Sequence, residues 1–148
     1  MKILVKNACI IDAVDSYPQG SDILIVDGII EQIGVGVEAE ADQIIDGTDL
    51  TVLPGLVDMH CHLREPGFEY KETVASGTHA AARGGYTTIC CMPNTKPVID
   101  DDDRLKNLLT IIEKDAVVNV LPIAAVSIGQ QSQNHTDMKK LKELGAIA

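Results

Sequence analysis

Two histidines separated by one residue give this sequence its clearest chemical signature. His60 and His62 stand at the end of an apolar run that begins at Thr51. Side chains alternate between the faces of a strand, so both imidazoles are expected on one face, with Cα atoms about 6–7 Å apart. Ring nitrogens placed in this way can converge on one metal ion, as imidazoles do on zinc. The pair therefore predicts a metal site.

Two further polar residues share that face of the predicted strand. Asp58 precedes the pair and is suited to orient one histidine ring, which would decide which nitrogen faces the metal. Arg64 follows the pair and offers a planar guanidinium that matches a carboxylate. Cys61 is expected on the opposite face as a packed core thiol. The alternative is a chance HxH pattern, and the shared face together with the turn at Glu65–Gly67 argues against it.

A second polar cluster, Met92–Pro97, follows the next predicted strand. Its Asn94 can donate and accept hydrogen bonds, which suits a substrate with amide and carboxylate groups. The alternative is a proline-flanked turn in which Asn94 bonds its own backbone. Lys96 is expected to be solvated. His79 and His135 are interpreted as surface residues.

Alternating strands and helices after residue 50 must position these polar groups, whereas the first 50 residues predict only short strands joined by turns. The expected strands of the first part lie at 3–5, 8–11, 21–26, 29–34 and 43–46. The expected elements of the second part are a strand over 51–60, a helix over 71–83, a strand over 86–92, a helix over 104–115 capped from Asp101–Asp103, a strand region over 116–126, and a helix over 138–144 that begins at Asp137 and ends at Gly145.

This order of elements predicts an α/β fold with right-handed βαβ units and a parallel sheet. The polar clusters then lie at the carboxyl ends of the strands, where (β/α) barrels carry their active sites. Ala146–Ala148 has the character of a fourth strand. Because three parallel strands would leave edges that folds usually cover, we expect the chain to be part of a larger barrel.

Composition limits the function classes. The formal net charge of −10 argues against a nucleic-acid partner. No run approaches the roughly 18 apolar residues of a membrane span, and the N-terminus lacks the apolar block of a signal peptide. The four cysteines form neither a CxxC pair nor a secreted disulfide framework. A cytoplasmic protein that does not bind membranes is expected.

Taken together, the motifs resemble those of the bacterial class I dihydroorotases in the amidohydrolase superfamily, over essentially the whole chain. The matching stretches are Leu53–Gly67, Gly84–Thr88 and Met92–Thr95. The HxH pattern occurs in many cyclic amidohydrolases, whereas Arg64 with the following Glu-Pro-Gly and the Met-Pro-Asn-Thr run are more specific. The resemblance implies part of a small β-sandwich at 1–50 and the first three to four βα units of a (β/α)8 TIM-like barrel at 51–148.

The resemblance also implies a two-zinc enzyme that interconverts N-carbamoyl-L-aspartate and (S)-dihydroorotate in de novo pyrimidine biosynthesis. His60 and His62 would bind the more buried zinc, and Arg64 and Asn94 would hold the substrate carboxylate. The bridging carboxylate, two further histidine ligands and the aspartate general base of this family are expected beyond residue 148. No catalytic residue is therefore expected within these 148 residues, which should be inactive alone.

Two other functions remain open at this point. One is a non-catalytic dihydroorotase-like protein that serves as a structural partner of aspartate transcarbamoylase. The other is a relative of the hydantoinase or allantoinase type. Retention of the HxH pair, Arg64 and Asn94 argues against the first, and Arg64 with the Met-Pro-Asn-Thr run argues against the second. The partners considered are the small-molecule substrate, a second copy in a homodimer, and aspartate transcarbamoylase.

Overall fold

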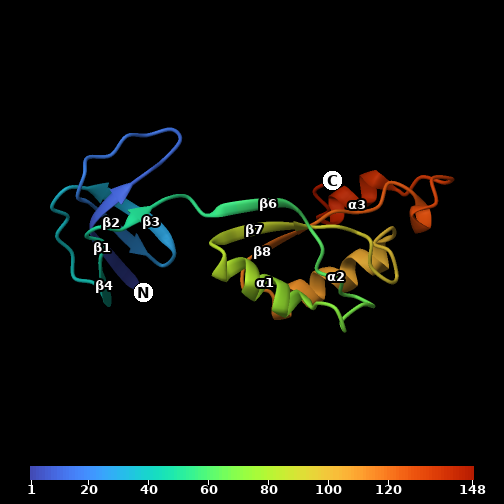
Figure 1. Cartoon of the computed structure of the whole chain (residues 1–148). Coiled ribbons are helices and arrows are strands. Elements are labelled where there is room, and N and C mark those ends of the chain that lie inside the picture. The colour runs from blue at the N-terminus through green and yellow to red at the C-terminus, as the bar shows by residue number, and fades with distance from the viewer. The chain divides into compact units, whose positions relative to one another are not determined.

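The computed structural model describes all 148 residues (Figure 1). The chain folds into two units, Met1–Pro54 and Gly55–Ala148. The first unit contains only strands, and the second alternates strands with helices. The chain is thus a mixed α/β protein, as its sequence predicts. None of its helices has the length and apolar character that crossing a membrane requires.

Five strands form the sheet of the first unit, in the order β3-β2-β1-β4, with β5 also beside β1. Their bounds are β1 (Lys2–Ile10), β2 (Ser21–Val26), β3 (Ile29–Gly34), β4 (Gln43–Asp46) and β5 (Thr51–Val52). β1 is one continuous strand, not the two strands expected at 3–5 and 8–11. Asn7 takes a positive φ of 60° and the pairing with β2 shifts register there, so the irregularity bends the strand without ending it. Asp27 and Gly28 form the hairpin turn between β2 and β3, both with positive φ.

One buried carboxylate connects three parts of the first unit. Asp22 on β2 is 1% exposed and accepts hydrogen bonds from the Lys6 ammonium at 2.8 Å, the Asn7 amide at 2.9 Å and the Val37 amide at 2.8 Å. The Lys6 hydrogen bond lowers the pKa of Asp22, and the two amides act in the same direction against the opposing effect of burial. Asp22 therefore ties β1 and the segment after β3 to β2.

The second unit is a parallel three-stranded sheet in the order β6-β7-β8. Its elements are β6 (Leu56–Cys61), α1 (Val74–Arg83), β7 (Tyr86–Cys91), α2 (Asp102–Asp115), β8 (Asn119–Pro122), the 3-10 turn η1 (Ile128–Gln130) and α3 (Met138–Leu144). α1 and α2 lie together along one face of the sheet (Figure 1). The core between them consists of apolar side chains, including Leu63, Val74, Ile89, Leu105, Leu108 and Val120.

The helix ends follow their capping residues. α1 begins at Val74, three residues later than predicted, because Thr73 and Ser76 form a capping box. Asp101 caps α2, and Asp137 with the left-handed Gly145 bounds α3, as predicted.

Three strand predictions in the second part of the chain need correction. The strand expected over 51–60 is divided into β5 and β6. Met59 on β6 is 76% exposed, because β6 is an edge strand with β7 as its one neighbour. β8 covers only Asn119–Pro122 of the expected 116–126, and Pro122 has no N–H with which to extend the ladder. Residues 146–148 are not a regular strand. They do lie beside β8, since the Ile147 amide donates to the Pro122 carbonyl and the Ala148 carbonyl accepts from Ala124.

We predict that Asp22→Asn destabilises the first unit by about 2 kcal/mol at neutral pH, since charged hydrogen bonds to Lys6 and the two amides are weakened. Hydrogen exchange of the Val37 amide in both proteins measures this. Because the folded pKa of Asp22 is lowered, its contribution is complete above the ordinary aspartate pKa of about 3.9 and disappears as the pH falls through the folded value. The two proteins should therefore converge in acid.

Asp49→Asn is the matched control, since Asp49 is exposed and takes a positive φ that asparagine tolerates. It should leave exchange at Val37 unchanged. Equal exchange in the Asp22→Asn protein and the native chain at neutral pH would contradict the role assigned to Asp22.

Candidate metal and substrate site

The two histidines of the HxH pattern meet at the carboxyl end of β6. His60 lies on the strand and His62 just beyond it, and their ring centroids are 5.3 Å apart with the ring planes at 73°. The strand is not regular here, because Asp58 pairs with Ile89 and Cys61 with Cys91, so β6 contains one residue more than β7 over this stretch. Such a bulge breaks the strict alternation of faces. The two imidazoles are nevertheless neighbours.

The bulge changes the surroundings of Asp58 and Cys61. These two residues, expected on opposite faces, both line a hollow of about 250 Å³ between β6 and α1, together with His62. The Asp58 carboxylate accepts a hydrogen bond from the His60 backbone amide at 2.9 Å. Asp58 therefore fixes the main chain of His60, whereas the sequence predicted that it would orient a histidine ring. Cys61 packs against the apolar core as predicted. Burial, reinforced by the Asp58 charge, raises the pKa of Cys61 to about 11, which keeps the thiol protonated and a poor metal ligand.

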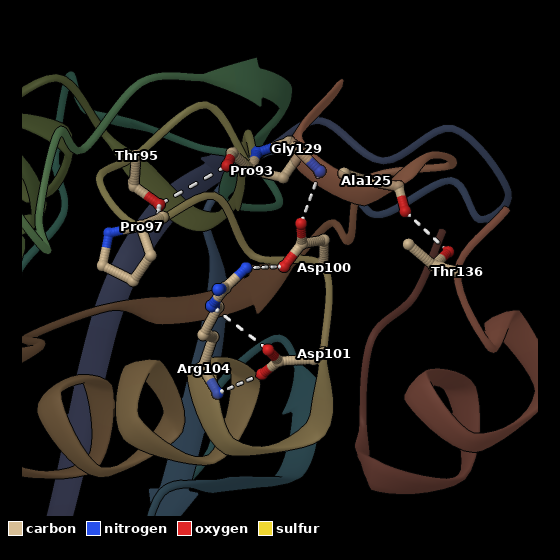
Figure 2. A network of polar contacts seen from close by, with 9 residues as sticks. All are labelled: Pro93, Thr95, Pro97, Asp100, Asp101, Arg104, Ala125, Gly129 and Thr136. Atoms are coloured by element: carbon tan, nitrogen blue, oxygen red, sulfur yellow. Dashed lines mark hydrogen bonds and ion pairs between the residues drawn. The ribbon is translucent and has the colours of Figure 1, made fainter. Parts of the chain in front are cut away.

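Asn94 reaches the histidine pair from the segment after β7. Its Oδ1 atom lies 2.9 Å from Nδ1 of His62, a contact between residues 32 positions apart. The alternative, in which Asn94 bonds its own backbone, is not what the structure shows. The predicted turn is present, since the Thr95 hydroxyl donates to the Pro97 carbonyl at 2.7 Å and to the Pro93 carbonyl at 3.4 Å (Figure 2). The Thr95 amide also donates to the Pro93 carbonyl, at 2.9 Å.

Arg64 occupies a strained position in the loop after β6. Its φ is 66°, in the left-handed region that an arginine rarely adopts, and such backbone strain concentrates at functional sites. The guanidinium is half-buried and makes no hydrogen bond or ion pair with the chain. All its donors are therefore available to an anion. The next residue, Glu65, accepts from the amide of Val74, the first residue of α1, at 2.7 Å and so ties this loop to the helix.

The loops that carry Arg64 and Asn94 touch each other. The Lys96 amide donates to the Pro66 carbonyl at 2.9 Å. Gly67 lies so close that a Cβ atom there would stand 1.9 Å from the Lys96 carbonyl oxygen. Glu65 and Gly67 were predicted only as part of a turn, and neither of these contacts was expected. An acidic side chain shortly before a helix start was the one sequence signal for the contact of Glu65 with α1. The close approach of Gly67 to Lys96 has no such signal, because it joins two loops that are distant in sequence.

The loop after β8 is held at the same edge of the sheet. Asp100 is 5% exposed, pairs with Arg104 and accepts from the Gly129 amide at 2.6 Å (Figure 2). The buried Thr136 hydroxyl donates to the Ala125 carbonyl at 2.8 Å. This polar network joins the segment after β7 to the loop after β8. His79 and His135 are both exposed, as predicted.

The donor set fits part of a metal site. Two adjacent imidazoles, one held by an amide oxygen, are ligands that zinc and similar ions accept. The chain contains no group of three or more histidine, cysteine, aspartate or glutamate side chains that could hold a metal. A hydrolytic zinc site usually has three protein ligands, so these residues would provide two of them.

Comparisons with known proteins agree with these motifs. A family model described as dihydro-orotase-like matches residues 50–148. The chain is 45% identical to a dihydroorotase of Ruminiclostridium cellulolyticum and 47% identical to one of Thermoanaerobacter sp., in each case over its whole length. It spans only 35% and 34% of those two relatives.

Solved structures of hydantoinases have a similar fold. The L-hydantoinase (dihydropyrimidinase) from Arthrobacter aurescens matches 97% of this chain with a TM-score of 0.84 and 26% identity, over 31% of its own length. The D-hydantoinase (dihydropyrimidinase) from Thermus sp. matches 96% with a TM-score of 0.72 and 28% identity, over 30% of its own length.

We predict that Gly67→Ala destabilises the second unit by about 3 kcal/mol, because the new methyl group would collide with the Lys96 carbonyl and the positive φ of 96° disfavours alanine. Urea unfolding followed by circular dichroism measures the loss. Gly85→Ala is the control, since Gly85 also has a positive φ but open space around it, and it should cost only about 1 kcal/mol. Equal losses in the two variants would show that the loop contact has no importance.

Proposed function

The chain belongs to the dihydro-orotase-like family, and from this premise we propose that it supplies the first metal-binding and substrate-binding residues of a dihydroorotase. Such an enzyme is a cyclic amide hydrolase that interconverts N-carbamoyl-L-aspartate and (S)-dihydroorotate in pyrimidine biosynthesis. The observation that carries the proposal is the meeting of the His60–His62 pair with Asn94 at the carboxyl ends of β6 and β7. Metal ligands and an amide group for a polar substrate are thereby joined in one place.

Arg64 and Asn94 are the proposed carboxylate-binding residues. The guanidinium of Arg64 has no partner in the chain, and its forked donors match the two oxygens of a carboxylate. Asn94 uses its Oδ1 atom on His62, so the NH2 group remains for a ligand. An NH2 group can only donate, which suits the acceptor oxygens of dihydroorotate. Both side chains thus offer donors where the substrate offers acceptors.

His60 and His62 would hold a divalent metal ion, and imidazole ligands favour zinc. For the whole enzyme we propose two zinc ions. When bound, the metal supplies Lewis-acid chemistry that polarises the amide carbonyl and lowers the pKa of water. The chain's own contribution is orientation. Asp58 fixes the backbone of His60, and Asn94 fixes the ring of His62. We place the general base and the remaining ligands outside these 148 residues.

We further infer the architecture of the whole enzyme. The five-stranded sheet of the first unit would belong to a small β-sandwich, with residues 1–50 as the domain, and residues 51–148 would begin a (β/α)8 barrel. The parallel order β6-β7-β8 with helices along one face supports the barrel assignment. A cytoplasmic location, a homodimer and an aspartate transcarbamoylase partner stay predictions.

A hydantoinase-type activity is the second candidate, favoured by the fold similarity to the Arthrobacter aurescens enzyme. Hydantoins without a carboxylate would leave Arg64 no anion to bind. Comparing turnover of dihydroorotate and hydantoin by the full-length protein decides between the two. Turnover of neither substrate would favour the third reading, a non-catalytic partner of aspartate transcarbamoylase.

We predict that Arg64→Ala in the full-length protein lowers kcat/KM for dihydroorotate about 10- to 100-fold, because a charged hydrogen-bonded contact to the carboxylate is lost. Arg64→Lys should be intermediate, since lysine retains the charge but not the fork. Steady-state kinetics measures both, and Arg83→Ala at the exposed end of α1 is the control. Unchanged kinetics in Arg64→Ala would remove this residue from the carboxylate site.

We also predict that the 148-residue chain alone does not hydrolyse dihydroorotate, with or without added zinc, because it provides two metal ligands and no general base. An absorbance assay of dihydroorotate consumption, with the full-length protein as positive control, measures this. Zinc-dependent turnover by the chain alone would contradict the assignment of the missing groups to later residues.

A further inference from the structure

Asn94 makes a hydrogen bond to one ring nitrogen of His62 through a single atom of its side-chain amide. The Oδ1 atom lies 2.9 Å from Nδ1 in a half-buried contact. An amide oxygen accepts hydrogen bonds and cannot donate them, so the hydrogen of this contact belongs to the ring nitrogen. A neutral imidazole carries a single N–H, and with that hydrogen on Nδ1 the lone pair is on Nε2.

We propose that Asn94 is a positioning residue that selects the Nδ1–H tautomer of His62 and so presents Nε2 to the metal. The metal part of this statement rests on the proposed function, whereas the tautomer is a property of the chain itself. Asn94 then has two roles at once, since its NH2 group remains free for the substrate carboxylate.

The oxygen of Asn94 is fixed by the backbone around it. The Thr95 and Ile99 amides both donate to the Pro93 carbonyl, at 2.9 and 3.1 Å. The Thr95 hydroxyl donates to the Pro97 carbonyl at 2.7 Å (Figure 2). The Lys96 amide is bound to the Pro66 carbonyl of the neighbouring loop. All of these bonds join groups within the chain. The acceptor for His62 is therefore held by the chain's own backbone, as preorganised sites require.

His60 provides an internal contrast. Its backbone amide is bound by Asp58, but its ring has no hydrogen-bond partner and only packs edge-on against His62. Both of its tautomers are therefore open in the free chain. The two histidines should behave differently in the same spectrum, which makes His60 a reference within the molecule.

The test is nitrogen-15 NMR of the histidine-labelled chain, in buffer well above the ordinary imidazole pKa of about 6.5. Long-range proton–nitrogen correlations distinguish a protonated ring nitrogen from one with a lone pair. The native chain should show His62 with Nδ1 protonated. Asn94→Ala should shift His62 towards the other tautomer, and Asn94→Asp should restore the native pattern, because a carboxylate oxygen also accepts from Nδ1. Asn107→Ala on the exposed face of α2 is the control and should change nothing.

The native spectrum alone can overturn the proposal. If His62 carries its hydrogen on Nε2, the amide must be turned so that its NH2 group donates to Nδ1, and the assignment is wrong. It is equally wrong if Asn94→Ala leaves the tautomer unchanged. The native spectrum tests the tautomer without any variant. A variant is compared with it only if its own spectrum is well dispersed, which shows that the variant is folded.

Zinc titration of the same proteins separates this proposal from the proposed function. Loss of the acceptor should weaken zinc binding about 10- to 100-fold in Asn94→Ala, with Asn94→Asp close to the native chain. Unchanged zinc affinity in Asn94→Ala would contradict the link between tautomer and metal. If the tautomer changes as expected but the native chain binds no zinc at His60 and His62, Asn94 still positions the ring, and it is the proposed function that fails.

Discussion

The parallel pairing of β6 with β7 is the constraint on which the site depends. Parallel neighbours end at the same edge of the sheet, so residues far apart in sequence become neighbours in space. His62 and Asn94 meet in this way at 2.9 Å, and the Lys96 amide reaches Pro66 a few residues further on. Antiparallel strands joined by a tight turn would place these ends at opposite edges. The chemistry of the site is thus a consequence of the crossover through α1.

Hydrogen bonds to backbone groups hold the loops at this edge, and the Asp100–Arg104 ion pair is added to them. Glu65 is bound to the first amide of α1, Gly67 allows the close approach to Lys96, and Asp100 binds the Gly129 amide. Main-chain groups cannot change rotamer, so bonds to them restrict a loop more than bonds between long side chains do. The arrangement leaves the guanidinium of Arg64 and the NH2 group of Asn94 free while their own backbones are fixed. Rigid loops with free donors are what recognition of a small anion requires.

Patterns local in sequence predicted most of the fold and the identity of the polar residues. Capping residues gave the ends of α3, and the spacing of His60 and His62 indicated that their rings would meet. Features that depend on partners distant in sequence were not predictable. The bulge that moves Cys61 to the side of Asp58 depends on the register with β7, and the exposure of β6 depends on its place at the sheet edge. Likewise, nothing near Asn94 in the sequence indicates that its oxygen would be taken by a histidine 32 positions away.

The left-handed backbone of Arg64 has a consequence for protein engineering. A φ of 66° would suit glycine or asparagine better, and an ordinary residue there costs about 1 kcal/mol. Selection for stability alone would therefore favour replacing this arginine, and a library screened only for heat resistance should lose it. A screen for binding of an anionic ligand should retain it. With the proposed carboxylate-binding role of Arg64, selection for thermal stability and selection for ligand binding favour different residues at position 64, and stability-guided redesign of this chain should leave it untouched.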